Sequence, residues 1–209
     1  MSSTQQTNNV LGLLIDSSGS MMDMNPKETT QSLNKNVQKI EAENTKIFAA
    51  RFSDEYEMFI KNKTKSEVVI KEEDITPHGL TALYDSIYQI CSDIRETINP
   101  DLENNITIII LTDGCENASQ KYNVNHIKKL ISDKKEEGWK FIFLGANQDA
   151  ITTGQTLGLD HKTCCTYSPH AGGLDNVLRS TSQAINRSAN LDEEIEFTQE
   201  ERNESMISN

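Results

Sequence analysis

Two apolar runs, each followed at once by oxygen-bearing side chains, constrain the fold of this chain more than any other feature. The first run, Val10 to Ile15, leads into Asp16-Ser17-Ser18-Gly19-Ser20, and the second, Ile106 to Leu111, leads into Thr112-Asp113-Gly114. Near-continuous apolar runs of this length are typical of strands that are covered on both faces, as in parallel sheets. We therefore expect the two runs to be neighbouring central strands.

The remaining pattern alternates strands with helices. Further strands are expected at Thr45 to Phe52, Tyr56 to Ile60, Glu67 to Ile70, Trp139 to Gly145 and Cys164 to Tyr167. Helical spacing of apolar residues is found from Pro26 to near Asn44 and at Ala82 to Ile98, Val124 to Glu137, Asp149 to Leu157 and Gly172 to Ala189. This order predicts an α/β fold with a doubly wound, mainly parallel sheet, one antiparallel edge strand and helices on both faces.

The length of 209 residues fits one domain, which we expect at residues 10–190. A polar N-terminal tail, residues 1–9, precedes it. Residues 191–209 contain six Glu, one Asp and one Arg and have little apolar content. They are expected to form an acidic mobile tail.

Charge and cysteine usage exclude several classes of protein. The net charge of -12 opposes nucleic-acid binding, which needs an excess of Lys and Arg on one face. The four cysteines include no CxxC pair, which favours a reducing compartment. Since neither a signal peptide nor a membrane-spanning run is found, a cytoplasmic protein without membrane contact is expected. Cys115 is expected to be a small packed side chain, and Cys164 and Cys165 should point to opposite faces of a strand.

The first loop has the chemistry of a site for a hard cation. Asp16, Ser18 and Ser20 follow one another at two-residue spacing, which places three oxygen donors on one side of a loop. In doubly wound sheets, ligands bind beyond the carboxyl ends of the strands, at the point where the strand order reverses. Asp113 follows the other central run, so both loops should meet at that edge. Ser and Asp are also ordinary turn and helix-cap residues, which is the structural alternative for each position.

At these residues the sequence resembles the von Willebrand factor A-type domain family, which includes the integrin inserted domains. The resemblance covers roughly residues 9–190 and consists of Asp16-x-Ser18-x-Ser20, Thr81 in a Gly-Leu-Thr loop, and Asp113 in Thr-Asp-Gly. It implies a metal-ion-dependent adhesion site (MIDAS) in which these five residues hold Mg²⁺. Mg²⁺ prefers about six oxygens and keeps several waters, so this ligand set suits it. Mn²⁺ or Ca²⁺ could substitute, whereas Zn²⁺ would favour Cys or His.

The resemblance implies a protein-recognition domain, not an enzyme, with a scaffold or assembly role. An Asp or Glu of a protein partner would take the open position on the metal. The alternative is a metal-dependent hydrolase, for instance a phosphatase with Asp16 as nucleophile, although no His or Lys is placed beside the carboxylates. In a third reading, Glu200, Glu201 or Glu204 of the tail fills that open position. Neither the partner nor the oligomeric state follows from the sequence.

Four further side chains lie near these motifs. Asp23 follows Asp16 at the position of an adjacent-site acid in some integrins, but Met24 replaces the second acid, so a surface role is expected. Met21 and Met22 could form an apolar rim around the metal or pack beneath the loop. His78 precedes Thr81 by three positions and is expected to be a loop histidine.

Overall fold

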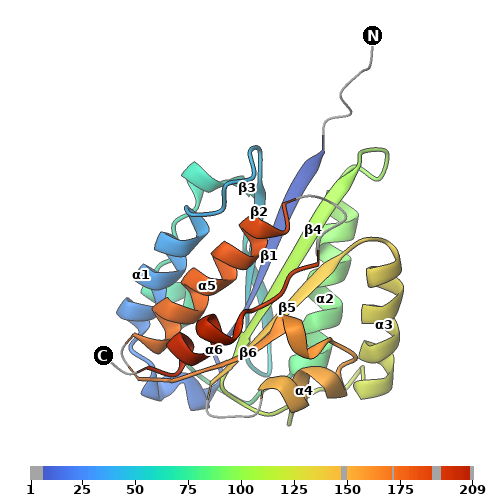
Figure 1. Ribbon diagram of the computed structural model, residues 1–209. Coiled ribbons are helices and arrows are strands. Elements are labelled where there is room, and N and C mark those ends of the chain that lie inside the picture. Colours follow the sequence, from blue (N-terminus) through green and yellow to red (C-terminus); the bar gives the residue numbers. More distant parts are fainter. Residues whose placement is uncertain (1–6, 147–149, 171, 190–193, 208–209) are drawn as a thin grey trace.

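The architecture is a central sheet between two layers of helices (Figure 1). The computed structural model describes residues 7–146, 150–170, 172–189 and 194–207. Over these residues the sheet has six strands in the order β3-β2-β1-β4-β5-β6. Their bounds are β1 Asn8–Asp16, β2 Lys46–Phe52, β3 Tyr56–Thr64, β4 Asn104–Thr112, β5 Lys140–Ala146 and β6 Cys164–Tyr167.

The predicted pairing of the two apolar runs is confirmed. β1 lies parallel to β4, with Val10 opposite Ile106 and Ile15 opposite Leu111, and β2 lies parallel to β1 on its other side. β3 is antiparallel to β2 at the edge of the sheet, as expected. The chain thus adds strands on one side of β1 and then continues on the other, so the strand order reverses between β1 and β4.

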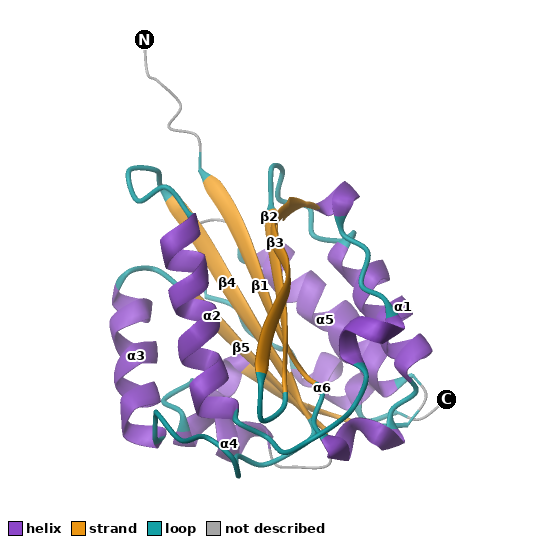
Figure 2. Cartoon of the chain, turned by 180° about the vertical axis from the view of Figure 1, so that it is seen from behind, coloured by secondary structure: helices purple, strands orange, loops and turns teal. Residues whose placement is uncertain are grey.

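Helices cover both faces of the sheet, and Figure 2 shows α2 and α3 on the face turned away in Figure 1. The helices are α1 Pro26–Val37, α2 Leu83–Thr97, α3 Val124–Glu136, α4 Ala150–Thr156, α5 Gly173–Arg187 and α6 Gln199–Ser205. Alternate residues of β1 serve two cores. Leu13 packs with residues of α1 and α5, and Leu14 packs with residues of α2 and α3. None of the described helices has the length and apolar character that membrane crossing requires.

Helix α1 begins where the sequence predicts and ends earlier. Pro26 occupies its first turn, and the Asn25 side chain accepts hydrogen bonds from the backbone N–H groups of Lys27 and Glu28. The predicted end near Asn44 is wrong because the chain must turn back to enter β2. The helix stops at Val37, and Asn44 adopts a left-handed φ of 55° shortly before β2 begins.

The predicted strand at Glu67 to Ile70 is also wrong. β3 continues past its predicted end at Ile60 to Thr64, and a short 3-10 helix, Lys65–Glu67, follows it. The backbone of Ile70 is paired with a side chain instead of a strand. Asn34 of α1 donates to the Ile70 carbonyl and accepts from its N–H, both at 2.8 Å. These bonds satisfy the Ile70 backbone without a neighbouring strand.

The segment expected to be a mobile tail is folded where the structure describes it, over residues 194–207. Ile195 and Phe197 are 2% and 3% exposed and join the core of the α1 and α5 face. α6 packs on α5 and β6, and Glu201 of α6 pairs with Arg187 at 2.7 Å. The sequence suggested disorder because the segment is mostly acidic. Its two buried apolar residues and its ion pair with Arg187 are too few to form a recognisable pattern.

Candidate functional site

The oxygen-bearing loops meet at one edge of the sheet. β1 ends at Asp16 and the adjacent parallel strand β4 ends at Thr112, so the residues that follow them emerge side by side. In Figure 1 this edge lies at the bottom, below the labels β5 and β6. It is also the point where the strand order reverses, as expected for a ligand site in a doubly wound sheet.

Asp16 is fixed from both sides. Its carboxylate is buried and accepts a hydrogen bond from the Ser18 N–H at 2.7 Å through Oδ1 and one from the Thr112 hydroxyl at 2.6 Å through Oδ2. The first bond curls the loop after β1, and the second ties that loop to the end of β4. Asp16 is therefore oriented before any ligand arrives.

A chain of hydroxyls connects this loop to Asp113. Ser20 Oγ donates to Asp113 Oδ1 at 2.6 Å, and Ser18 Oγ lies 3.0 Å from Ser20 Oγ. Because the Ser20 proton is directed at the carboxylate, Ser18 is the donor to Ser20. The hydroxyl protons of Ser18 and Ser20 are thus turned toward the Asp113 carboxylate, which is partly buried. The 2.6 Å bond from Ser20 to Asp113 has the length of a charge-assisted contact.

Thr81 reaches the same place from a third loop. Gly79 has a left-handed φ of 68°, and its carbonyl accepts a 3.1 Å hydrogen bond from the N–H of Gly19 in the first loop. The Thr81 N–H donates to Asn117 Oδ1 at 2.8 Å, which ties this loop to the segment after β4. Thr81 is 2% exposed. Its side chain is thus directed inward between the two other loops.

Gly114 marks the point at which the three loops converge. A Cβ atom placed on Gly114 would lie 3.1 Å from Ser20 Oγ, 3.1 Å from Thr81 Oγ1 and 3.7 Å from Asp16 Oδ2. Three oxygens, from the loop after β1 and the loop of Thr81, therefore face one small volume beside Gly114 of the loop after β4, which the absence of a side chain on Gly114 leaves open. With the Asp113 bond to Ser20, all five predicted site residues are brought into one cluster.

The two carboxylates are in an unfavourable electrostatic environment. Burial raises the pKa of Asp16, and the charge of Asp113 raises it further, against the hydrogen bonds from Thr112 and Ser18. Burial also raises the pKa of Asp113, and exposed Asp23 adds to that effect, against the bond from Ser20. The ionised form of both groups is thus disfavoured in the protein alone, and a bound cation would offset this cost.

The methionines, the histidine and the cysteine near the site agree with the sequence predictions only in part. Met21 is buried beneath the loop, as one of the two readings predicted, whereas Met22 is 70% exposed and does not pack beneath it. His78 is within hydrogen-bond distance of Ser53 Oγ, at 3.1 Å, and of the Thr76 carbonyl, at 3.0 Å, as a loop histidine. The prediction that Cys115 is packed is wrong, because its side chain is exposed two residues after Asp113.

Asn117 was not singled out from the sequence, and Thr112 and Gly114 were named only as neighbours of Asp113, without roles of their own. Thr112 and Asn117 position Asp16 and Thr81, and Gly114 provides the open volume. The Thr-Asp-Gly triplet was a usable signal for two of them, since a hydroxyl and a glycine flank the acid. In the described part of the chain, no group of three or more His, Cys, Asp or Glu could hold a metal ion. The cluster found here depends on hydroxyls instead.

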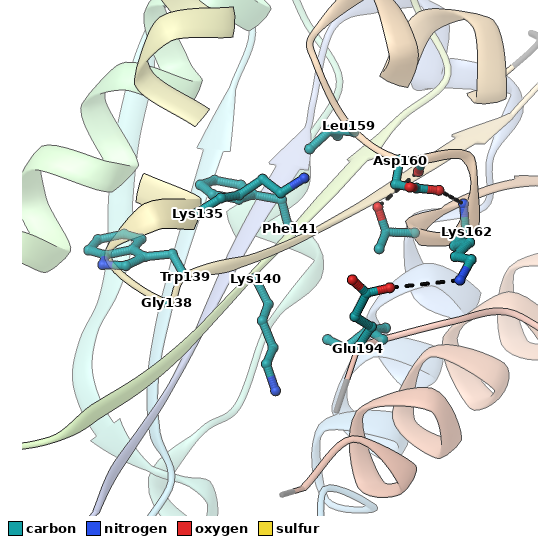
Figure 3. A pocket seen from close by; sticks show the side chains of 11 residues that line it. Lys135, Gly138, Trp139, Lys140, Phe141, Leu159, Asp160, Lys162 and Glu194 are labelled. Carbon is teal, nitrogen blue, oxygen red and sulfur yellow. Dashed lines mark hydrogen bonds and ion pairs between the residues drawn. The ribbon is translucent and has the colours of Figure 1, made fainter. Parts of the chain in front are cut away.

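A separate cavity of about 260 Å³ lies at the opposite edge of the sheet (Figure 3). Phe141 near the start of β5 and Leu159 before β6 form part of its wall. Two of its lysines already have protein partners: Lys140 donates to the Ser188 carbonyl at 3.1 Å, and Lys162 lies 3.7 Å from the Glu194 carboxylate. The cavity shares no residue with the oxygen-bearing loops and is not part of the candidate site.

Comparison with solved structures identifies the class of fold. No protein-family model matches the chain, and no curated protein is significantly similar in sequence. Proximal thread matrix protein 1 (PTMP1) from the mussel byssus has a TM-score of 0.64 and 15% identity over 84% of this chain and 45% of its own. The vWF domain of the pili tip protein Mfa5 from Porphyromonas gingivalis has a TM-score of 0.65 and 11% identity, over 88% and 96%.

The VWA domain of SpRpn10 is a further match, with a TM-score of 0.61 and 10% identity over 81% of this chain and 93% of its own. Another structure of PTMP1, at a TM-score of 0.59 and 18% identity over 77% of this chain and 41% of its own, is described as having a zinc occupied MIDAS motif. This chain spans less than half of PTMP1. The fold is that of von Willebrand factor A domains, as the sequence resemblance implied.

Proposed function

We propose that this chain is a Mg²⁺-dependent protein-recognition domain whose metal accepts the carboxylate of a partner's Asp or Glu. The observation that carries the proposal is the approach of Ser20 Oγ, Thr81 Oγ1 and Asp16 Oδ2 to one point beside Gly114. Oxygen donors of this kind suit Mg²⁺, and Mn²⁺ or Ca²⁺ could substitute. The zinc reported at the corresponding motif of PTMP1 supports a divalent cation as the ligand class.

The roles of the residues follow from their contacts. Ser18, Ser20 and Thr81 would supply neutral oxygens, and Asp16 and Asp113 would supply the charge. Thr112 and the Ser18 N–H hold Asp16 in place. When bound, Mg²⁺ would supply an electrophilic position for an incoming carboxylate, because two carboxylates and three hydroxyls leave its coordination incomplete. This mechanism binds a partner without cleaving a bond. A cytoplasmic location, supported by the cysteine usage of the sequence, is part of the proposal.

The hydrolase alternative lacks support at Asp16. Both of its oxygens already accept hydrogen bonds, from Ser18 and Thr112, and burial disfavours its ionised form. His78, the histidine of the loop that carries Thr81, lies within hydrogen-bond distance of Ser53 and Thr76. The reading in which the tail fills the site is also weakened. Glu201 and Glu204 form ion pairs with Arg187 and Arg179 on the helical face.

Titration calorimetry with MgCl₂ and MnCl₂ tests the metal site. The Asp113→Asn variant keeps an oxygen for Ser20 and removes the charge, so it should lower the affinity for either metal at least tenfold, roughly 1.4 kcal/mol. The matched control is Asp101→Asn, an exposed acid near the start of β4 at the other edge of the sheet. It should leave the affinity unchanged. Equal affinities in the wild type and Asp113→Asn would contradict the proposal.

A further inference from the structure

Two large apolar side chains are exposed on the loops that carry the candidate metal ligands. Met22 is 70% exposed and lies two residues after Ser20, and Leu80 is 56% exposed and directly precedes Thr81. The two loops are joined by the hydrogen bond from the Gly19 N–H to the Gly79 carbonyl. Single exposed apolar residues are common on protein surfaces, but here two of them accompany the hydroxyls of one site.

The orientation of Met22 is set by its neighbours in a short 3-10 helix, Gly19–Asp23. Met21 and Met24 are 4% and 5% exposed and belong to the core of the α1 and α5 face. These two side chains anchor the turn from below. Met22 is consequently held toward solvent by a fixed backbone.

Leu80 is held outward in the same way. Gly79 adopts a left-handed φ of 68°, and Asp54 Oδ1 accepts a 3.3 Å hydrogen bond from the Leu80 N–H. Since Thr81 is directed inward and is 2% exposed, the preceding side chain is left at the surface. The exposure of Leu80 therefore follows from the conformation of its loop. That conformation is fixed by hydrogen bonds to Gly19, Asp54 and Asn117 of three other loops.

The charges around this surface restrict a partner further. Asp54 beside Leu80 and Asp23 beside Met22 are both exposed acids, and the chain has a net charge of -12. One carboxylate of a partner can be compensated by a metal. Additional acids next to it would meet these two aspartates and be repelled.

We propose that the site, if it binds a carboxylate through a metal as proposed above, recognises a peptide segment in which one Asp or Glu lies beside a large apolar residue. The acid occupies the metal, the apolar neighbour packs on Met22 and Leu80, and the remaining flanks are neutral or basic. Burial of a large apolar side chain on such a surface changes affinity roughly tenfold. The inference thus assigns the sequence character of the partner, which the metal site alone leaves open.

The test uses an immobilised library of short peptides that contain one central glutamate and randomised flanks. The full chain is applied in MgCl₂ and in EDTA. Peptides retained only in MgCl₂ should be enriched in Leu, Ile, Met or Phe within two positions of the glutamate and depleted of further acids. Met22→Ser and Leu80→Ser should each lower the affinity for a selected peptide roughly tenfold. Leu102→Ser, another exposed leucine in the loop before β4, is the matched control and should bind as the wild type does.

The outcomes separate this inference from the proposed function. Mg²⁺-dependent retention of glutamate peptides without an apolar preference, or unchanged affinity in both serine variants, would overturn the inference and leave the proposed function standing. No Mg²⁺-dependent retention of any peptide would overturn both. Mn²⁺ titration of Met22→Ser and Leu80→Ser should match the wild type. A loss of Mn²⁺ affinity in these variants would mean that they disturb the metal loops, and this too would overturn the assignment of a packing role.

Discussion

At the scale of single residues, the candidate site depends on a glycine, because the space beside Gly114 has no room for a side chain. Gly114 lies where a methyl group would be 3.1 Å from both Ser20 Oγ and Thr81 Oγ1. Gly114→Ala should therefore push these oxygens apart and lower the affinity for Mn²⁺ at least tenfold, roughly 1.4 kcal/mol, because the geometry of the donors is lost. Titration calorimetry measures the effect.

Gly138→Ala is the control for this substitution. Gly138 has a φ of 86° and no atom within 4 Å of an added Cβ. Alanine should cost about 1 kcal/mol of stability there, because left-handed backbone is unfavourable for it, and should leave Mn²⁺ affinity unchanged. If Gly114→Ala kept full affinity for the metal, the proposed convergence of ligands at this point would be wrong.

The cysteines give a prediction of a different kind. Cys115 is exposed, whereas Cys91, Cys164 and Cys165 are buried, and burial raises the pKa of Cys91 and of Cys164 to about 12. Thiolates react and thiols do not, so a maleimide should label Cys115 in the folded protein and all four cysteines in denaturant. Peptide mass mapping identifies the labelled positions. Fast labelling of any buried cysteine would show that its part of the core opens readily.

The sequence predicted that these five residues would lie together because their motif combines residue types and spacings that are visible in one dimension. Thr112 and Asn117 escaped prediction because their partners, Asp16 and Thr81, are distant along the chain. Such bonds depend on how strand ends and loops meet in space. Cys115 was misplaced for a similar reason, since exposure within a loop is set by tertiary contacts and not by residue type.

At the scale of elements, the segment from Ile195 to Ser205 behaves as part of the fold. Glu201 bonds to both Arg187 and the backbone of Thr198. Glu201→Gln should reduce the free energy of unfolding by about 1–2 kcal/mol, since Arg187 loses its ionic partner. Urea denaturation measures this loss. Glu200→Gln, at an exposed position of the same helix, should have no effect and serves as the control.

The same pair gives an acid dependence. Burial alone would raise the pKa of Glu201, but the hydrogen bonds from Arg187 and Thr198 hold it below its ordinary value of 4.5. The contribution of ionised Glu201 to the free energy of unfolding is fully present above pH 4.5 and is lost as the pH falls through the lowered pKa. The hydrogen-exchange protection factors of residues 194–207, which are corrected for the pH dependence of the intrinsic exchange rate, should therefore fall at acidic pH in the wild type. In Glu201→Gln these protection factors should already be lower at neutral pH, and equal protection of both proteins would contradict the assigned role.

Helices and strands with a clear apolar pattern were predicted well. Segments whose conformation depends on one or two side-chain hydrogen bonds were not. The near-continuous apolar runs of β1 and β4 predicted buried parallel strands, as the structure has them. The segment around Ile70 has the same residue types, yet the Asn34 side chain takes the place of a strand partner. Similarly, Ile195 and Phe197 are too few to give a pattern, although both are buried.

At the scale of the whole molecule, metal binding and folding are linked. The loops that carry Asp16, Thr81 and Asp113 are joined to one another by hydrogen bonds, so a ligand held by all three stabilises the native state. Mg²⁺ at a hundred times its dissociation constant should add about 2.7 kcal/mol to the free energy of unfolding. Thermal melts in MgCl₂ and in EDTA report this stabilisation as a rise in melting temperature. Asp113→Asn, with at least tenfold weaker binding, should gain about 1.4 kcal/mol or less at the same Mg²⁺ concentration and show a correspondingly smaller rise.

Ionic strength must be matched in these melts. Because the chain has a net charge of -12, any salt relieves its self-repulsion to some extent. NaCl at the ionic strength of the MgCl₂ sample is therefore the control. Equal melting temperatures in the two salts would argue against a specific site for the divalent ion.

The antiparallel edge strand β3 has a consequence for the behaviour of the protein in concentrated solution. An open strand edge is a template on which another chain can add, and aggregates grow from such edges. β3 carries exposed Lys61 and Lys63 in its second half, and its register against β2 is irregular near Ala49. Two copies that approached edge to edge would bring these ammonium groups together on a distorted strand, so intermolecular sheet growth from this side is disfavoured.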